Sequence, residues 1–308
     1  MYFLILRSFI FIFITIISYI FLVKISPFLV KDIPNSRSSH NKPIYRGGGI
    51  VFVLVSFLSI PITKFYSLFT LIPLILTSYW DDLFSLSPKI RYVVQLVTVF
   101  LILHFNLNLP INNFIIYFFI LIIGTAIINF TNFIDGIDGI LASNMLIAFL
   151  HLSCLNQDYK LYPLMAGILA FLFLNKAPAK LFMGDIGSTF LGAIFFMKII
   201  ELSDYRTAFL SLSAVFPIYI DTTICVIARF CNKENIFVSH KKHLYQRLVT
   251  SGLSHNKVTI IYSLSSALIC LSCYTNNIKI VSIILILIFF IGLLLNYFIA
   301  SSFIERKN

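Results

Sequence analysis

Apolar residues form long runs along this chain, and short polar segments separate the runs. A helix of roughly 20 apolar residues spans a bilayer. About eleven runs approach that length, near residues 2–23, 47–62, 65–79, 92–108, 113–131, 139–155, 161–175, 186–201, 206–228, 258–274 and 279–302. We therefore predict an all-α, polytopic membrane protein with about 10–11 transmembrane helices in a single domain, 1–308. The runs 47–62 and 65–79 are short, so the boundary between them stays open.

Composition supports the same class of protein. Of the 308 residues, 59% are hydrophobic and 11% are charged, whereas about a quarter of the residues of an average soluble domain are charged. The first apolar run is about 22 residues long, longer than the 7–15 of a signal-peptide core, so we expect an uncleaved helix. The five cysteines lie mostly inside apolar runs, which argues against a disulfide framework.

The basic residues predict the orientation in the membrane. Lys and Arg are enriched in short cytoplasmic loops, and most of the 23 in this chain fall on one side of the eleven-helix arrangement. This bias places the N-terminus outside and the C-terminus inside. Topology and an anionic inner leaflet account for the net charge of +11, so we expect no nucleic-acid partner. The polar loops that carry motifs lie on the cytoplasmic side, where we expect the active site.

Six acidic residues have positions that composition does not explain, and carboxylates at membrane depth are costly enough to suggest function. They are Asp81, Asp82, Asp135, Asp138, Asp185 and Asp221. Asp81 and Asp82 are adjacent and would repel each other unless a cation or proton is shared. The alternative for this pair is two solvated loop aspartates.

Two further loops combine carboxylates with glycines. In NFTNFIDGIDG, 129–139, a helical spacing of three would put Asp135 and Asp138 on one face; the alternative is a polar turn between two spans. In NKAPAKLFMGDIGS, Asp185 directly precedes an apolar run. Carboxylate oxygens together with substrate phosphates are the usual ligands of Mg²⁺, and the alternative for Asp185 is a helix N-cap.

Two other loops are basic. The first, 239–258, carries the polar residues His240, Lys241, Lys242, His243, Arg247 and His255. It lacks the H-E-x-x-H spacing of a zinc site and suits a phosphate clamp or a positive-inside patch. The second, 35–49, carries His40, Lys42, Arg46 and three glycines without a Walker lysine. Its glycines also suit close helix packing. Acidic loops that suit Mg²⁺ and basic loops that suit phosphate together indicate an enzyme of phosphoryl transfer. Because the site would be embedded in a membrane, we expect one substrate to be a lipid.

Five motifs, in this order, resemble the polyprenyl-phosphate N-acetylhexosamine-1-phosphate transferases (glycosyltransferase family 4), which include the phospho-MurNAc-pentapeptide translocase. They are RSSHNKPIYRGGGI, DDLFSLSPKIR, NFTNFIDGIDG, NKAPAKLFMGDIGS and HKKHLYQRL with SHNKV. The basic loop 239–258, called the histidine loop below, is most similar to the branch that starts O-antigen synthesis from UDP-N-acetylfucosamine or UDP-N-acetylquinovosamine. Lys241 stands where that branch has arginine. The translocase matches less well, because its histidine triplet is missing and Ser85 stands where its lysine follows the aspartate pair.

The resemblance implies a phosphotransferase that depends on Mg²⁺, for which Mn²⁺ could substitute. The implied reaction converts UDP-HexNAc and undecaprenyl phosphate into undecaprenyl-diphosphate-HexNAc and UMP. Its implied metal ligands are Asp185 and, more weakly, Asn132. The implied catalytic residues are Asp81, Asp82, Asp138 and Asp185. The implied substrate-binding residues are Asn132, Asp135, Asn175, Phe182, His240, Lys241, His243, Arg247 and Arg46. The implied location is the bacterial inner membrane, and a homodimer stays open.

Other classes of function stay open as alternatives. A transporter or lipid flippase should show ionisable residues near mid-membrane and an internal repeat, and no repeat is evident. A CDP-alcohol phosphotransferase should show one compact acidic helix motif, which is not found. Within the superfamily, a UDP-GlcNAc-specific or peptidoglycan-precursor transferase remains. Asp221 lies inside an apolar run and either reaches the site or pairs with a neighbour as a structural buried acid.

Overall fold

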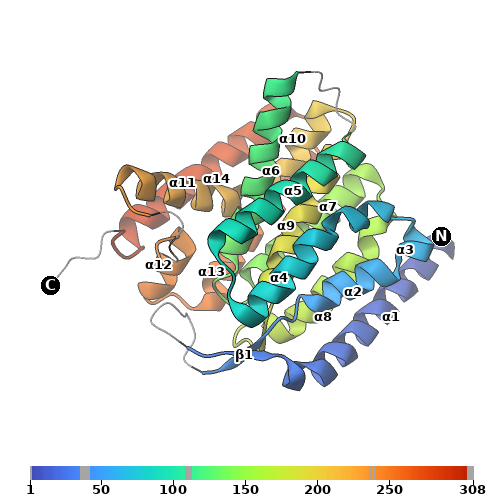
Figure 1. Ribbon diagram of the computed structural model, residues 1–308. Coiled ribbons are helices and arrows are strands. Elements are labelled where there is room, and N and C mark those ends of the chain that lie inside the picture. The colour runs from blue at the N-terminus through green and yellow to red at the C-terminus, as the bar shows by residue number, and fades with distance from the viewer. Residues whose placement is uncertain (1, 35–41, 108–112, 236–237, 239, 304–308) are drawn as a thin grey trace.

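The computed structural model describes residues 2–34, 42–107, 113–235, 238 and 240–303, with side chains from residue 8 onward. His40, from the second basic loop, lies outside these residues. The described chain is a bundle of α-helices with one small three-stranded sheet at one end (Figure 1). The predicted class, an all-α polytopic membrane protein, is confirmed.

The helices follow one another with short connections. In chain order they are α1 (Tyr2–Ile25), α2 (Ile50–Leu58), α3 (Ile60–Thr63), α4 (Ile72–Phe84), α5 (Pro88–Asn106), α6 (Phe114–Ile134), α7 (Ile140–Asn156), α8 (Tyr162–Asn175), α9 (Asp185–Ile200), α10 (Tyr205–Ser213), α11 (Phe216–Cys231), α12 (Leu244–Thr250), α13 (His255–Cys273) and α14 (Ile278–Phe298). Three 3-10 helices, η1 (Ser26–Phe28), η2 (Tyr66–Leu71) and η3 (Tyr159–Leu161), and the strands β1 (Val30–Asp32), β2 (Ile44–Arg46) and β3 (Leu181–Phe182) complete the fold.

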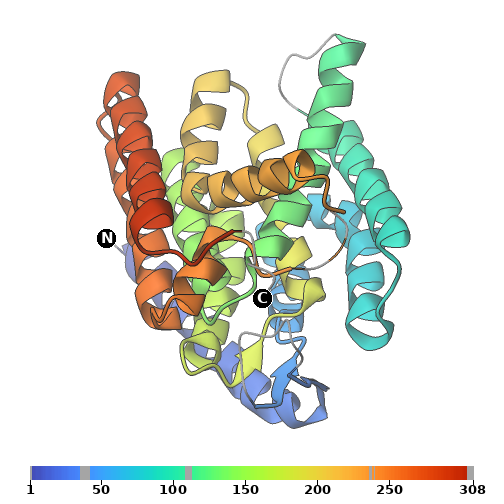
Figure 2. The same ribbon diagram turned by 90° about the vertical axis from the view of Figure 1, so that its left-hand side faces the viewer.

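Fewer helices are long enough to span a bilayer than the apolar runs suggest. Within the described residues, five have both the length and the hydropathy, and they cover Ser8–Phe28, Pro88–Asn106, Phe114–Ile134, His255–Cys273 and Ile278–Phe298. The α10–α11 pair, bent by 79°, makes a sixth if it is counted as one span (Figure 2). The run 47–62 is divided between α2 and α3, and the latter ends at Lys64 in a left-handed conformation. The predicted 10–11 spans therefore include several helices that are too short by this measure.

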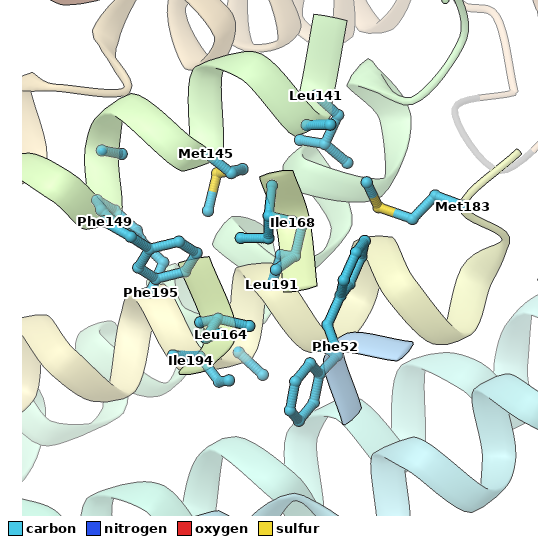
Figure 3. Packing of buried hydrophobic residues seen from close by; sticks show 14 of the residues in the cluster. Phe52, Leu141, Met145, Phe149, Leu164, Ile168, Met183, Leu191, Ile194 and Phe195 are labelled. Carbon is cyan, nitrogen blue, oxygen red and sulfur yellow. The ribbon is translucent and has the colours of Figure 1, made fainter. Parts of the chain in front are cut away.

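Helix α9 is the centre of the bundle. Every residue from Ile186 to Ile200 is buried, as expected for a helix that is mostly apolar, and the buried Lys198 is paired with Asp158 and Glu201. The helix packs against α6, α4, α5, α2 and α7. Figure 3 shows Leu191, Ile194 and Phe195 of α9 among apolar side chains of α2, α7 and α8. The first turn of α9 is thus held in a fixed position relative to several neighbouring helices.

The small sheet joins the N-terminal segment to the start of α9. Strand β2 pairs antiparallel with β1 and parallel with β3, which places Arg46 opposite Phe182. The chain then approaches α9 closely, because a Cβ at Gly49 would lie 2.2 Å from Cα of Gly187. Only glycine permits this backbone contact. The close-packing interpretation is therefore confirmed for Gly49, and for Gly48, where a Cβ would lie 2.6 Å from the Leu181 side chain, but not for Gly47, where the nearest atom would be 3.9 Å away. The pairing of β2 with β3 also brings Arg46 close to the start of α9.

Candidate active site

The side chain of Asp82 caps the N-terminus of α9. Its Oδ1 accepts a hydrogen bond from the backbone N–H of Asp185 at 2.9 Å, and its Oδ2 accepts one from Ile186 at 3.1 Å. The first amides of a helix lack partners within the helix, so a carboxylate from α4 serves here as the cap. The predicted metal ligand Asp185 is therefore oriented through its own backbone by a second predicted catalytic residue.

Arginines flank this cap on two sides. Nε and Nη2 of Arg46 lie 2.9 and 2.8 Å from Oδ1 of Asp82. Nη1 of Arg91 lies 3.0 Å from Oδ2 of Asp81 and 3.2 Å from Oδ2 of Asp185. Charge-assisted hydrogen bonds of this kind are the strong ones. Arg91 was missed by the sequence prediction, although it follows the aspartate pair in the same motif, DDLFSLSPKIR.

Negative charge outweighs positive charge at this end of α9. Burial raises the pKa of the Asp185 carboxyl well above its usual range, and the neighbouring Asp81 and Asp82 raise it further. Burial also raises the pKa of Asp82, although Arg46 opposes that shift. Burial and the charge of Asp82 raise the pKa of Asp135 to about 7. Carboxylates destabilised in this way favour an additional cation.

The donor atoms at this position suit Mg²⁺. Asn132, in the last turn of α6, accepts a 2.6 Å hydrogen bond from Oγ of Ser188 and so lies beside the first turn of α9. Mg²⁺ is usually bound through one or two carboxylates together with substrate phosphates. The Asp185 carboxylate and the Asn132 amide oxygen are hard ligands of the required kind, and the residues present fit the ion.

The loop of Asp135 and Asp138 is a turn, so the predicted helical face is wrong. Helix α6 ends at Ile134 and α7 begins at Ile140, and Gly139 between them has a φ of +77°. The backbone already leaves the helical region at Asp135, where ψ is 54°, and Gly139 is the N-cap of α7. The polar-turn alternative therefore describes the backbone, and the spacing of three carries no helical meaning here.

Within this turn, Asp138 holds two other segments. Its Oδ2 accepts from the backbone N–H of Ala179 at 3.1 Å, and its Oδ1 lies 3.3 Å from Nδ1 of His255. Buried Asn175 acts similarly: its Oδ1 accepts from Gly139 N–H at 3.0 Å and its Nδ2 donates to the Leu181 carbonyl at 2.9 Å. These contacts brace the turn against β3. The predicted uridine contact of Asn175 stays a prediction, as does that of half-buried Phe182.

The histidine loop packs against the same turn. Tyr245, fully buried in the first turn of α12, donates from its hydroxyl to the Phe133 carbonyl at 2.9 Å. The ring of His243 lies 6.3 Å from that of Phe133 and 5.0 Å from that of His240. His243 is buried, whereas His240 and Lys241 are half-buried. The structure thus places the acidic turn and the histidine loop side by side, as the sequence predicted.

Burial, together with the nearby His243 and Arg229, lowers the pKa of His240 to about 3. The ring is therefore neutral at physiological pH. In that state it would contact a phosphate as a hydrogen-bond donor and not as a charge.

Asp221, on α11, holds the histidine loop in place through direct hydrogen bonds. Its carboxylate accepts from the backbone N–H groups of Leu244 at 2.8 Å and Tyr245 at 3.1 Å, and from the hydroxyl of Tyr262 at 2.7 Å. His243 Nδ1 lies 3.8 Å from Oδ1 of Asp221. Of the two alternatives for Asp221, the structural buried acid is the one that these contacts support.

Arg247 faces the C-terminal part of the chain. Its guanidinium donates to the carbonyl of Lys242 at 3.1 Å, to that of Ser301 at 2.9 Å and to the side chain of Asn296, and it lies 5.5 Å from the centre of the Phe303 ring. Among the described residues, no contact joins it to the carboxylates at the start of α9. Its position is explained by holding α12 against the end of α14, and its role toward phosphate stays a prediction.

Known proteins are similar to this chain over most of its length. A model of glycosyl transferase family 4 matches residues 64–203, a range that includes the aspartate pair, the acidic turn and Asp185. A probable undecaprenyl-phosphate N-acetylglucosaminyl 1-phosphate transferase of Bacillus subtilis is 30% identical over 264 residues, which cover 75% of this chain and 73% of the relative.

Two further relatives extend the comparison. An undecaprenyl-phosphate alpha-N-acetylglucosaminyl 1-phosphate transferase of Thermotoga maritima is 30% identical over 70% of this chain and 71% of its own length. A phospho-N-acetylmuramoyl-pentapeptide-transferase of Fervidobacterium nodosum is 28% identical over 58% of this chain and 65% of its own length.

Proposed function

Because this chain belongs to glycosyl transferase family 4, we propose that it transfers a HexNAc-1-phosphate from a UDP-HexNAc donor to undecaprenyl phosphate, with release of UMP. The observation that carries this proposal is the group of carboxylates and two arginines at the start of α9. Phosphoryl transfer depends chiefly on positioning and on charge stabilisation. This group supplies both at one end of the most buried helix.

The residues of the chain have distinct parts in the proposed reaction. An oxygen of the lipid phosphate attacks the sugar-bearing phosphorus in line, and UMP leaves. The second pKa of a phosphomonoester is about 6, so the lipid phosphate is largely dianionic at neutral pH and needs no strong base. Arg46 and Arg91 would offset charge near the reacting phosphates. Asp81 would accept a residual proton, and a double displacement through an aspartyl intermediate is the second-ranked alternative.

Mg²⁺, for which Mn²⁺ would substitute, would be held by Asp185 with Asn132 and by donor phosphate oxygens. When bound, such an ion neutralises phosphate charge and acts as a Lewis acid. Asp82 would keep the Asp185 backbone in place, and the turn at Asp135 and Asp138 would shape the pocket for the nucleotide.

The donor sugar is a matter for experiment. The histidine loop suggests UDP-N-acetylfucosamine or UDP-N-acetylquinovosamine and a role in starting O-antigen or a related surface glycan. The names of two relatives make UDP-GlcNAc an equally direct candidate. The distribution of Lys and Arg predicts that the site faces the cytoplasm, and we propose the bacterial inner membrane as the location.

The test is UMP release by the purified protein in detergent. Undecaprenyl phosphate and Mg²⁺ are supplied with each of the three UDP-sugars, with and without EDTA. We expect release with one donor, and only when lipid and metal are both present. Failure of every donor with folded protein would contradict the proposal, and transport of lipid across a proteoliposome membrane would then be the reaction to assay.

Asp185→Asn tests the metal ligand. We expect turnover to fall by about 1000-fold, the scale of losing a principal electrostatic contact in a transition state, with normal membrane insertion. Asp204→Asn is the matched control, because Asp204 caps α10 at the exposed surface and lies beyond the far end of α9, about 24 Å away by the helix rise. Ordinary activity in Asp185→Asn would refute the assignment.

A further inference from the structure

Three side chains that can bind metal converge beside the histidine loop. They are Cys225 of α11 and His240 and His243 from the segment that leads into α12. One ligand atom of each lies within 4.8 Å of the other two. Cys225 and His243 are buried, and His240 is half-buried. The sequence motifs gave no sign of this group, because the cysteine comes from a different helix.

The backbone explains why these residues meet. Asp221 caps α12 through the amides of Leu244 and Tyr245, and this holds His243 against α11. Cys225 follows Asp221 by four residues on α11, a spacing that puts both side chains on one helical face. The group is therefore a consequence of the cap and does not depend on a flexible surface contact.

The chemistry of these ligands differs from that at the start of α9. Thiolate and imidazole are borderline-soft ligands that suit Zn²⁺, whereas Mg²⁺ prefers oxygen. We propose that Cys225, His240 and His243 form a binding site for Zn²⁺, separate from the Mg²⁺ position at Asp185. A water molecule would complete the four ligands that zinc usually takes.

The surroundings of His243 match a metal ligand. Its Nδ1 is buried and has no hydrogen-bond partner, and it lies 3.8 Å from Oδ1 of Asp221. Histidines that bind metal commonly point their other ring nitrogen at a carboxylate, which fixes the orientation of the ring. His243 can therefore bind through Nε2 with Nδ1–H toward Asp221. At His240, binding through Nε2 would cost the 3.2 Å hydrogen bond that Nδ1 accepts from Lys242 N–H.

The local charges are compatible with a dication. A thiolate at Cys225 and the Asp221 carboxylate would together balance the charge of Zn²⁺. Two of the nearby cations are already paired with a carboxylate: Glu234 lies 3.2 Å from Nε of Arg229 and 2.6 Å from Nζ of Lys242. Zinc bonds of 2.0–2.3 Å place tetrahedral ligands about 3.5 Å apart. The group must therefore contract by roughly 1 Å, which rotation of side chains can supply.

Cobalt binding tests the site directly. Co²⁺ replaces Zn²⁺ in tetrahedral sites and is coloured, so the tag-free protein is treated with EDTA, dialysed and titrated with Co²⁺. We expect one equivalent to bind with a near-ultraviolet thiolate charge-transfer band, and one equivalent of Zn²⁺ to abolish the band. Absence of the band in folded protein would overturn the proposal.

Paired variants identify the ligands. Cys225→Ser and His240→Ala should each remove the charge-transfer band or weaken Co²⁺ binding at least tenfold. Cys231→Ser is the control, because Cys231 is exposed at the end of the same helix and should bind as the wild type does. A band that survives in Cys225→Ser, or is lost in Cys231→Ser, would place the metal elsewhere. Thermal melting of each variant shows whether it is folded.

A consequence for activity rests on the proposed function. If His240 and His243 contact the donor, Zn²⁺ would occupy the same rings and inhibit UMP release in the presence of Mg²⁺. Cys225→Ser should then need at least tenfold more Zn²⁺ for equal inhibition. Zinc inhibition unchanged in Cys225→Ser would contradict this consequence. If no UMP is released at all, the proposed function fails while the cobalt result still decides the metal site.

Discussion

Two aspartates do the same structural work in two regions of this molecule. Asp82 of α4 accepts from the first two backbone amides of α9, and Asp221 of α11 accepts from the first two of α12. In each region a carboxylate from one helix caps another helix that carries predicted functional residues. The two caps differ in their remaining partners.

The partner of Asp82 is a permanent charge, whereas Asp221 has a tyrosine hydroxyl and a histidine. Arg46 lies 2.8 Å from Asp82, and Tyr262 donates to Asp221 at 2.7 Å. In the proposed reaction the first cap would therefore be part of the electrostatics around the phosphates. The second is a hydrogen-bonding device that positions a loop. Substitutions at the two caps should separate chemistry from positioning.

Asp82→Asn should have the largest effect of the paired substitutions. The amide keeps the size of the side chain but removes the charge that holds Arg46, and its NH₂ group faces an N–H group of α9. We expect UMP release to fall by about 100- to 1000-fold, the range for losing one preorganised electrostatic group. Steady-state rates beside those of Asp204→Asn measure this, and a loss below tenfold would contradict the difference between the two caps.

Asp221→Asn should reduce activity less but stability more clearly. Three donors point at this carboxylate, and an amide cannot accept from all of them. Leaving a buried donor unsatisfied costs about 1–3 kcal/mol. We expect a lower melting temperature and a loss of activity of about tenfold, because the histidine loop shifts while the carboxylates at α9 stay in place. Rates and melting curves are recorded on the same preparation, and an activity loss as large as that of Asp82→Asn would remove the distinction.

Tyr262→Phe isolates one hydrogen bond of the second cap. The hydroxyl is removed while the buried ring stays, so the expected cost is about 1 kcal/mol. Thermal melting in detergent measures it against Tyr274→Phe, whose ring is exposed at the end of the same helix. A Tyr262→Phe variant as stable as the wild type would show that the two amides alone hold Asp221.

Asp135 lies between the two regions, and its pH dependence should be the smallest effect. Its pKa of about 7 in the folded protein is above the usual 3.9 of an unfolded aspartate. The folded state therefore binds more protons over this range, and stability falls as pH rises from about 4 to above 7. Melting curves in EDTA should show a steeper decline between pH 5 and 8 for the wild type than for Asp135→Asn. Parallel curves would contradict the raised pKa.

The sequence was enough to predict the class of fold and to single out the polar loops that carry the candidate site. Long apolar runs predicted helices, and the positive-inside bias directed attention to loops that the structure brings together at the start of α9 and α12. Residues such as Asp82 and Asp185 were found because a charge beside an apolar run is costly wherever it lies.

Contacts between distant helices could not be predicted in this way. Arg91 looked like one more basic residue of a cytoplasmic loop until α5 was placed beside α9. The pairing of Cys225 with the histidines depends on the Asp221 cap, which has no local signature. The helical interpretation of Asp135 and Asp138 was wrong because a spacing of three has meaning only in a helix, and the helical backbone of α6 already ends at Asp135.

The three-stranded sheet has a consequence for how the protein is made. Strand β2 can pair with β3, and Gly49 can meet Gly187, only after the ribosome has synthesised the chain as far as α9. Strand β2, which carries Arg46, therefore lacks its β3 partner while α4 to α8 are synthesised. Asp82 likewise has no helix to cap until α9 follows. The candidate active site can therefore be complete only after α9 has been synthesised.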